Sequence, residues 1–328
     1  MVLALFLHFT GARVMQNIFE IAQKVVRENS YRDKIESMSA GAIRLAAHGL
    51  LSLGKLKDAQ IMLGWIEEEA PQGLLLKCAQ EAKRKKEYRV ALDVFLMIGD
   101  LHQLREFGTF CFQKQNYAIA LKAFAKLGDV ERLISIGQIC MEASHPDSYL
   151  VALDAFTACE DSFKLLELGD AAATTWRSNP QPSDDNELTR CGLIAMNAYL
   201  RAGSKGKVVA LGWEAFHAKD YDLMLHCFSE ANDRIALSDA GKQFLQMGDL
   251  EHAKKCLYLA GDEEGLFQWA VAAFNEMRPR DVLRELFSSD RTQAFFDRFV
   301  EQAHNFLRSG KDEMAWEMYE EIVRFQNA

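Results

Sequence analysis

The side chains best suited to bind a metal are the eight histidines and seven cysteines of this 328-residue chain. His252 and Cys256 lie one helical turn apart, so a helix would carry both on the same face. A zinc site needs three or four ligands, and no further histidine or cysteine lies near this pair in the sequence. We therefore predict no metal site and interpret the pair as part of a helix face.

The cysteines also bear on catalysis and on the cellular compartment. Their number is odd, no two form a Cys-x-x-Cys pair, and their separations are 33, 29, 19, 32, 36 and 29 residues. This pattern is typical of small core residues in successive helices and favours a reducing compartment over a disulfide framework. None has an activating neighbour in the sequence, so we predict no thiol nucleophile. The seven positions are Cys78, Cys111, Cys140, Cys159, Cys191, Cys227 and Cys256.

The motifs of nucleotide-binding and hydrolytic sites are missing. The stretch Ala202-Gly-Ser-Lys-Gly-Lys207 resembles a phosphate-binding loop, but it lacks the four-residue spacer between glycines and the Ser or Thr after the lysine. The sequence contains no Gly-x-Ser-x-Gly and no Gly-x-Gly-x-x-Gly. We therefore predict a helix–helix turn at 202–207, no cofactor and no catalytic residues.

The composition indicates which elements must position these side chains. Only 5 of the 328 residues are proline, against a usual share of about 5%. Leu and Ala, which are strong helix formers, far outnumber the β-branched residues that favour strands. The sequence therefore predicts an all-α chain.

The sequence repeats with a period of 29 to 32 residues. Residues 88–100 and 117–129 match at a shift of 29, with Tyr, Ala-Leu, Phe and Gly-Asp at the same positions. Further copies begin at Tyr149 and Tyr221, and another includes Ala253 and Leu257. Such a period predicts stacked units, because one short unit cannot bury its apolar face alone.

Each copy contains signals for two helices and two turns. In the second copy Tyr117, Ala120, Leu121 and Phe124 lie at i, i+3, i+4 and i+7, which is one face of a helix. Gly or Asn follows, which readily adopts the left-handed conformation at a helix end, and then Asp, a preferred N-cap of the next helix. These pairs are Gly99-Asp100, Gly128-Asp129, Asn232-Asp233 and Gly261-Asp262.

The other turn of each unit is polar. We predict that its helix N-caps are Asn116, Ser148, Asp220 and Asp249, each four residues before an aligned helix-face position. Asp100 with Gln103 also has the spacing of a capping box. The predicted unit is therefore helix, Gly-Asp turn, helix, polar turn.

These units resemble the short, degenerate repeats of the tetratricopeptide-like α-solenoid superfamily, such as those in the helical arrays of clathrin, coatomer and intraflagellar-transport subunits. The resemblance covers roughly residues 40–320 and is strongest at 74–170 and 215–270. The copies mostly lack the 34-residue length and the Trp/Leu-Gly-Tyr and Pro positions of a standard unit. The resemblance implies an α-solenoid of stacked antiparallel helix pairs that binds a partner on a concave surface.

An interruption divides the predicted array. Residues 171–189 contain two of the five prolines and a cluster of polar turn formers. We expect N-terminal helices or a cap at 1–39, a first array at 40–170, a loop or hinge at 171–189, and a second array with a C-terminal cap at 190–328.

The apolar segment 1–9 has the length of a signal-peptide core. No basic residue precedes it and no clear cleavage site follows it, so a first helix, or an extension upstream of Met15, is the favoured interpretation. No stretch reaches the roughly 20 apolar residues of a membrane span. We expect a cytoplasmic protein, with secretion as the less favoured alternative.

Charge is unevenly distributed along the chain. The net charge is −9, and residues 1–164 contain 20 basic and 20 acidic residues, whereas 165–328 contain 18 basic and 27 acidic ones. The acidic second half argues against general nucleic-acid binding. The basic run Lys83-Arg84-Lys85-Lys86 fits a helix C-terminus, where cations complement the helix dipole. The alternative is a basic patch for an acidic partner, a lipid head group or RNA.

The resemblance also suggests candidate binding residues. In the superfamily the first helix of each unit lines the concave surface, and here the helix after each Gly-Asp turn would take that place. Its polar residues include Gln103, Arg105, Arg132 and Gln138. Trp176, beside the interruption, is a candidate anchor, or else it holds the loop against the array.

Together these features predict a non-enzymatic scaffold that binds a protein or peptide on the concave face of a helical-repeat array. The alternatives are an enzyme or regulatory subunit with a site near 171–189, and a structural subunit of a coat-like or transport-like assembly. We expect no cofactor, no nucleic-acid partner and no membrane-spanning segment.

Overall fold

The computed structural model describes residues 47, 50–51, 55–64, 72–178, 186–287 and 295–326. These residues form 17 α-helices, α4 to α20, and no strand. Consecutive helices pack against one another in pairs, so the chain is an all-α helical-repeat solenoid and the predicted fold class is confirmed. The expected N-terminal cap at 1–39 lies outside the described residues. The chain divides into two compact units between Asp161 and Ser162.

Unit 1 contains seven described helices. They are α4 (Leu56–Gly64), α5 (Gln72–Arg84), α6 (Tyr88–Ile98), α7 (Leu101–Gln113), α8 (Tyr117–Leu127), α9 (Val130–Glu142) and α10 (Pro146–Ala158). The most extensive contacts join helices across the polar turns, which pairs α5 with α6, α7 with α8, and α9 with α10. Contacts across the Gly-Asp turns are smaller.

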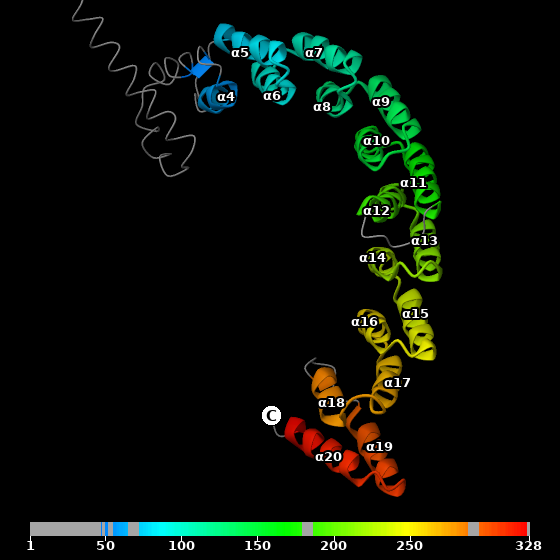
Figure 1. Ribbon diagram of the computed structural model, residues 1–328. Coiled ribbons are helices and arrows are strands. Elements are labelled where there is room, and N and C mark those ends of the chain that lie inside the picture. The colour runs from blue at the N-terminus through cyan, green and yellow to red at the C-terminus, as the bar shows by residue number, and fades with distance from the viewer. Residues whose placement is uncertain are drawn as a thin grey trace, which may run out of the picture. The chain divides into compact units, whose positions relative to one another are not determined.

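The helices of unit 1 form two layers. One layer contains α4, α6, α8 and α10, and the other contains α5, α7 and α9 (Figure 1). Among the described residues, α6 and α8 contact their neighbours within the first layer more than α5, α7 and α9 contact one another. The unit accordingly bends toward the layer of α6, α8 and α10 (Figure 1).

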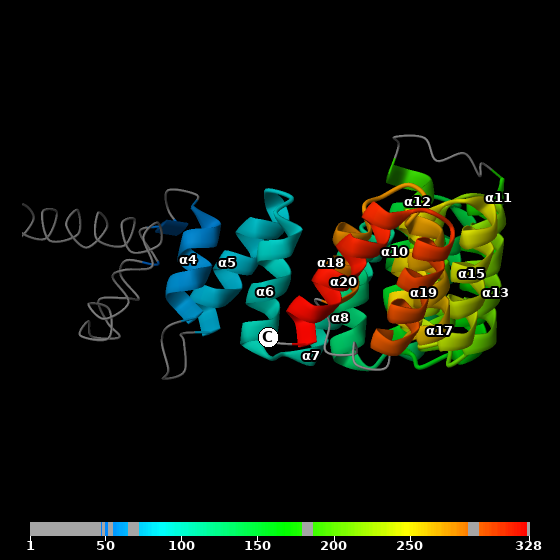
Figure 2. The same ribbon diagram turned by 90° about the horizontal axis from the view of Figure 1, so that it is seen from below.

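Unit 2 repeats the same pairing. It contains α11 (Ser162–Arg177), α12 (Asn186–Arg201), α13 (Lys205–His217), α14 (Tyr221–Ala231), α15 (Arg234–Met247), α16 (Leu250–Ala260), α17 (Glu263–Ala273), α18 (Pro279–Phe287), α19 (Phe296–Arg308) and α20 (Asp312–Gln326). The pairs α11–α12, α13–α14, α15–α16 and α19–α20 make the largest contacts, and α18 packs on α20. Helices α13, α15 and α17 follow one another along one layer of the unit (Figure 1) and overlap when the unit is seen from below (Figure 2).

The predicted Gly-Asp turns are confirmed. Gly99 and Asn232 have φ angles of 71° and 53°, and each ends a helix in the left-handed conformation. Asp100 then caps α7, accepting hydrogen bonds from the backbone N–H groups of His102 at 2.9 Å and Gln103 at 3.2 Å. The capping box is incomplete, because Oε1 of Gln103 has no hydrogen-bond partner.

The polar turns follow the prediction less closely. Asp220 and Asp249 cap α14 and α16 as expected, but Asn116 makes no side-chain capping bond at the start of α8. The predicted cap Ser148 is wrong: α10 begins at Pro146, and Nδ1 of His145 accepts the hydrogen bond from the N–H of Asp147. Proline is favoured in the first helical turn because it has no N–H to satisfy there, which starts α10 early.

A repeated glycine explains why several of the helix pairs pack closely. Gly137 on α9 faces Phe156 on α10, and a Cβ added to it would lie 2.4 Å from the Phe156 ring. Gly212 on α13 faces Phe228 on α14 in the same way, at 2.5 Å. The aromatic ring therefore fills the space that a side chain on the preceding helix would take. This contact is the physical meaning of the repeated Gly and Phe positions.

The predicted interruption at 171–189 is shorter than expected. Helix α11 continues to Arg177 and α12 starts at Asn186, while residues 179–185 lie outside the described part of the chain. The Ala-rich stretch after Gly169 extends the buried face of α11, since Ala172 and Ala173 are buried. The polar threonines Thr174 and Thr175 are accommodated because their hydroxyls donate to carbonyls one turn earlier.

Candidate partner-binding groove

The four polar residues predicted from the resemblance lie in the layer of α5, α7 and α9. Gln103 and Arg105 are on α7, and Arg132 and Gln138 are on α9. In unit 1 this layer is on the outer side of the bend, because the bend closes toward α6, α8 and α10 (Figure 1). The helix after each Gly-Asp turn therefore does not line the concave side of unit 1, contrary to the expectation from the superfamily.

The structure does not gather these residues into one site. Gln103 lines a cavity of about 460 Å³ between α5 and α7, and Arg105 lines a separate shallow one of about 270 Å³. The guanidinium of Arg132 lies 5.7 Å from the ring centre of Phe112. Gln138 is half-buried on α9 and lines neither of these cavities.

Trp176 stabilises the fold and is inaccessible as a surface anchor. Its side chain is only 4% exposed, and its indole N–H donates to Asp220 Oδ2 at 3.2 Å. Asp220 is also the N-cap of α14, so this bond connects α11 to the start of α14. Of the two roles expected for Trp176, the structure shows the one that holds the segment against the array.

A groove that the sequence did not single out lies at the edge of unit 1, where the polar turns are. Two adjoining cavities of about 570 and 940 Å³ share Lys86, Tyr88, Asn116 and Ala118 among their lining residues. We call this pair of cavities the turn-edge groove. The larger one spans the starts of α4, α6 and α8, and the smaller one reaches Asp147 at the start of α10.

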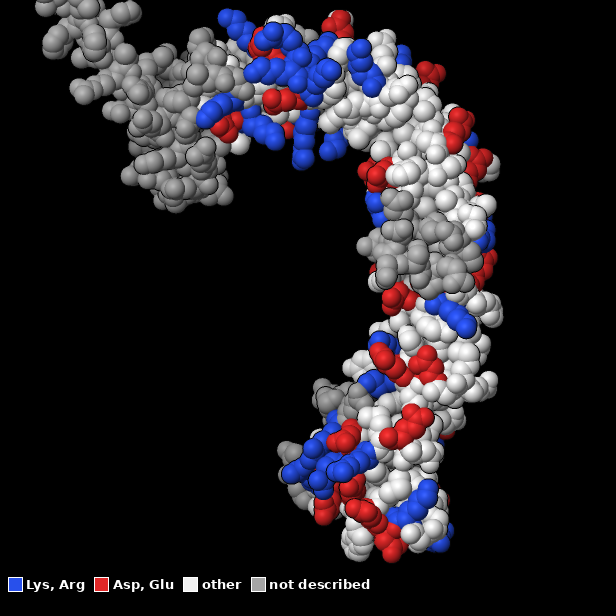
Figure 3. Space-filling model, viewed as in Figure 1, with Lys and Arg blue, Asp and Glu red and all other residues white. Residues whose placement is uncertain are grey.

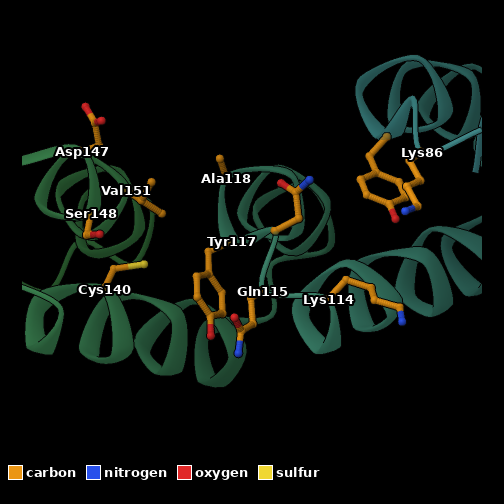
Figure 4. A pocket seen from close by; sticks show the side chains of 11 residues that line it. Lys86, Lys114, Gln115, Tyr117, Ala118, Cys140, Asp147, Ser148 and Val151 are labelled. Carbon is orange, nitrogen blue, oxygen red and sulfur yellow. The ribbon is translucent and has the colours of Figure 1, made fainter. Parts of the chain in front are cut away.

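Basic side chains surround most of this groove. Lys55, Lys57, Lys86 and Arg89 line the larger cavity together with the acids Asp58 and Glu87, and Lys86 and Lys114 line the smaller one together with Asp147. Figure 3 shows Lys and Arg side chains gathered over α5 and α6. Within the smaller cavity Lys86 and Lys114 lie on one side and Asp147 on the other (Figure 4). Cations therefore outnumber acids in both cavities, and Asp147 lies at the end nearest α10.

Several cations of this region form no ion pair with the acids that the structure describes. Lys57, Lys85, Lys86, Arg89 and Lys114 form no ion pair with any residue that the structure describes. In unit 2, by contrast, many of the basic residues form ion pairs with carboxylates. Examples are Arg177 with Glu214, Lys207 with Asp170, Lys242 with Asp262, Arg284 with Glu321 and Arg298 with Glu264.

Two aromatic residues form the floor of the groove. The ring of Tyr88 packs edge-on against Phe110 with 5.9 Å between centres, and Tyr117 packs edge-on against Phe112 at 5.8 Å. Both tyrosines are half-buried, so their rings are held in place by the adjacent helix. The groove thus combines half-buried aromatic rings with exposed cationic side chains.

The structure shows the surroundings of the thiols and of His252, which the sequence singled out for nucleophilic or metal chemistry. Burial raises the pKa of the Cys140 thiol, which lines the smaller cavity, to about 11. Burial likewise raises the pKa of the Cys256 thiol to about 12. His252 Nδ1 lies 2.8 Å from Asp249 Oδ2, and the ring stacks on Phe244. Among the described residues, no three His, Cys, Asp or Glu side chains form a metal-binding group.

Comparisons with known proteins assign no family to this chain. No protein-family model matches the sequence, and no curated protein matches it. Among solved structures, the chain is similar to one described as a circular tandem repeat protein with novel repeat topology and enhanced subunit contact surfaces. The identity is 14%, the TM-score is 0.20, and the match covers 95% of this chain and 82% of the other. No described helix is long and apolar enough to cross a membrane.

Proposed function

We propose that this chain is a non-enzymatic interaction scaffold, and that the turn-edge groove and the adjoining helices of unit 1 bind a protein or peptide partner. The observation that carries the proposal is the set of basic side chains around two adjoining cavities, most of which have no ion-pair partner in the described structure. Unpaired charges at a concave surface are available to a ligand, whereas charges already in ion pairs are not.

The fold and the repeat pattern support this proposal. Stacked helix pairs present an extended surface, which repeat proteins commonly use for binding. The resemblance of the 29-residue units to tetratricopeptide-like repeats favours the same class of function. None of the seven cysteines, which all lie in the described part of the chain, is in a disulfide, and this is consistent with the cytoplasmic location that we propose. The raised pKa values of the buried thiols support a role without catalysis, because the thiolate is the reactive form.

The proposal can be tested by cross-linking mass spectrometry on partners captured with the full chain from its source cells. The wild type is compared with a variant in which Lys86, Arg89 and Lys114 are changed to Gln. A matched variant carries Arg105→Gln, Lys122→Gln and Lys126→Gln, which removes three exposed cations elsewhere on unit 1.

We expect partner cross-links to residues of unit 1 near the groove, and we expect them to be lost in the first variant and retained in the second. Cross-links confined to α7 and α9, around Gln103 and Arg132, would instead favour the layer that the resemblance suggested. If the chain captures no protein partner and instead converts a small-molecule substrate, the scaffold function is refuted.

A further inference from the structure

We propose that the ligand of the turn-edge groove is a carboxylate-rich peptide segment, about six residues of Asp and Glu in extended conformation. This inference rests on the proposed function and specifies the chemistry of the partner. It depends on three features: the uncapped N-termini of α6 and α8, the charged side chains around them, and the length of the groove.

The helix starts in the groove have unsatisfied amides. The first N–H groups of any α-helix have no partner within the helix. At the start of α6 the preceding residue is Glu87, and at the start of α8 it is Asn116; neither makes a side-chain capping bond. Both helix starts line the larger cavity, through Tyr88 to Val90 and through Ala118 and Ile119.

The equivalent position in unit 2 shows which group fits there. Asp220 stands at the repeat position of Asn116, and its carboxylate accepts from the N–H of Leu223 at 3.2 Å while its other oxygen accepts from Trp176. Asp249 accepts from the N–H of His252 at 3.2 Å and contacts the same residue's Nδ1 at 2.8 Å. At α14 and α16 the fold therefore places its own carboxylate at this position, beside the indole N–H of Trp176 in one case and the ring of His252 in the other.

At the starts of α6 and α8 in unit 1 the amide donors lack a capping carboxylate, because Asn116 is uncharged and the Glu87 side chain makes no capping bond. Around the starts of α6 and α8 the second donors are the cations Lys86, Arg89 and Lys114, which form no ion pair with any described residue. A carboxylate supplied by a partner would bind a helix N-terminus and a cation together. Such charge-assisted bonds are shorter and stronger than neutral ones.

The length of the groove fits a short extended segment. Neighbouring packed helices are about 8–10 Å apart, so the starts of α4, α6 and α8 span roughly 20 Å. An extended chain advances about 3.3 Å per residue, so roughly six residues cover this distance. Successive side chains point to opposite faces, and about three carboxylates would meet the groove.

A peptide is favoured over a nucleic acid on two grounds. The chain has a net charge of −9, so its overall field repels a long polyanion while a short segment meets only the local basic surface. The rings of Tyr88 and Tyr117 are half-buried and packed against Phe110 and Phe112. Single-stranded nucleic acids are typically bound by exposed aromatic rings on which bases stack.

The test uses fluorescence anisotropy with the full 328-residue chain. The probe is a fluorescein-labelled octapeptide of alternating Asp and Glu. The comparison ligands are the same peptide with Asn and Gln, and a labelled ten-nucleotide oligouridine. The groove variant is Lys86/Arg89/Lys114→Gln, and the matched control variant is Arg105/Lys122/Lys126→Gln. The two variants have the same net charge, and their helicity is checked to be equal.

We expect the acidic peptide to bind the wild type and the matched variant with similar Kd, and the groove variant about tenfold more weakly, since each exposed ion pair contributes a factor of roughly two to five. The Asn-Gln peptide should not bind measurably. Equal weakening in both variants, equal binding of the Asn-Gln peptide, or tighter binding of the oligouridine would each overturn the proposal.

A fourth variant, Asn116→Asp, tests the helix starts themselves. It places a carboxylate where Asp220 has one in unit 2, so it should raise the denaturation midpoint and weaken peptide binding at the same time. Unchanged peptide binding in a stabilised Asn116→Asp protein would contradict the role of the α8 amides. If the acidic peptide does not bind but a cellular partner still cross-links to unit 1, this inference fails while the proposed scaffold function stands.

Discussion

The packing of a glycine on one helix against an aromatic ring on the next makes a prediction about stability that can be worked out from the structure. Gly137 lies within α9, and a Cβ there would be 2.4, 2.6 and 2.9 Å from three atoms of the Phe156 ring. Ordinary contacts of this kind begin near 3.4 Å. Phe156 is fully buried, so its ring cannot move into solvent.

Two effects of Gly137→Ala oppose each other. Alanine is a better helix former than glycine by about 1 kcal/mol. Overpacking a close-packed core costs about 1–3 kcal/mol, and an overlap of roughly 1 Å against a fixed ring belongs at the upper end of that range. We therefore expect Gly137→Ala to lower the free energy of unfolding by about 1–2 kcal/mol.

Other glycines provide a graded control series. A Cβ at Gly206 on α13 would meet nothing within 4 Å, so Gly206→Ala should stabilise by about 0.5 kcal/mol. At Gly108 the nearest atoms are Ala123 Cβ at 3.1 Å and the Phe124 ring at 3.2 Å, and Gly108→Ala should be close to neutral. The expected order of stability is Gly206→Ala, then wild type and Gly108→Ala, then Gly137→Ala.

The assay is urea denaturation followed by far-UV circular dichroism, with hydrogen exchange across α9 and α10. Exchange is needed because repeat units can open separately. Adding Phe156→Leu to Gly137→Ala should cost less than the sum of the two single changes. If Gly137→Ala is as stable as Gly206→Ala, or if the double variant is simply additive, the packing argument is wrong.

Three further predictions concern turns, caps and thiols. Gln115 has a φ of 59°, a left-handed conformation that costs a residue with a side chain about 1 kcal/mol or more. Glycine adopts this conformation without that cost, so Gln115→Gly should raise the midpoint of urea denaturation. A lower midpoint would contradict this prediction. Asp249→Ala should cost about 1 kcal/mol through loss of the α16 cap, measured by thermal denaturation, whereas no loss would show that water replaces the cap. Burial raises the pKa of Cys227 and Cys256 to about 12, while unfolded thiols titrate near 8.5. The contribution of these buried, protonated thiols to the free energy of unfolding should therefore be fully present below about pH 8.5 and decrease as the pH rises toward 12. An unchanged midpoint of urea denaturation between pH 8 and pH 10 would refute this prediction.

The helices and half of their turns could be predicted because local chemistry decides them. A glycine or asparagine followed by aspartate ends one helix and caps the next, and this holds at Gly99-Asp100 and Asn232-Asp233 without reference to the rest of the chain. The polar turns were harder. At Ser148 the alignment of repeats suggested a cap, but Pro146 starts α10 earlier, so His145 takes that position.

The binding surface could not be predicted in the same way. The run at 83–86 was visible as a charge cluster, but a run of lysines has the same sequence whether its side chains are paired or unpaired. Arg84 does pair with Glu81, whereas Lys85 and Lys86 form no ion pair with described residues. The difference depends on which acids the neighbouring helices bring close, and that is a property of the tertiary contacts.

The sequence by itself determined the helical class, the 29-residue period and the positions of the Gly-Asp turns, because each depends on residues within one or two helical turns of one another. Only the tertiary structure decided that Trp176 is buried against Asp220, that the layer of α6, α8 and α10 is the inner one in unit 1, and that cations surround the turn-edge groove. These features arise between helices that are tens of residues apart in the chain. Their physical cause is packing between neighbouring helices, as at Gly137 and Gly212, where the absence of a side chain leaves room for an aromatic ring of the next helix.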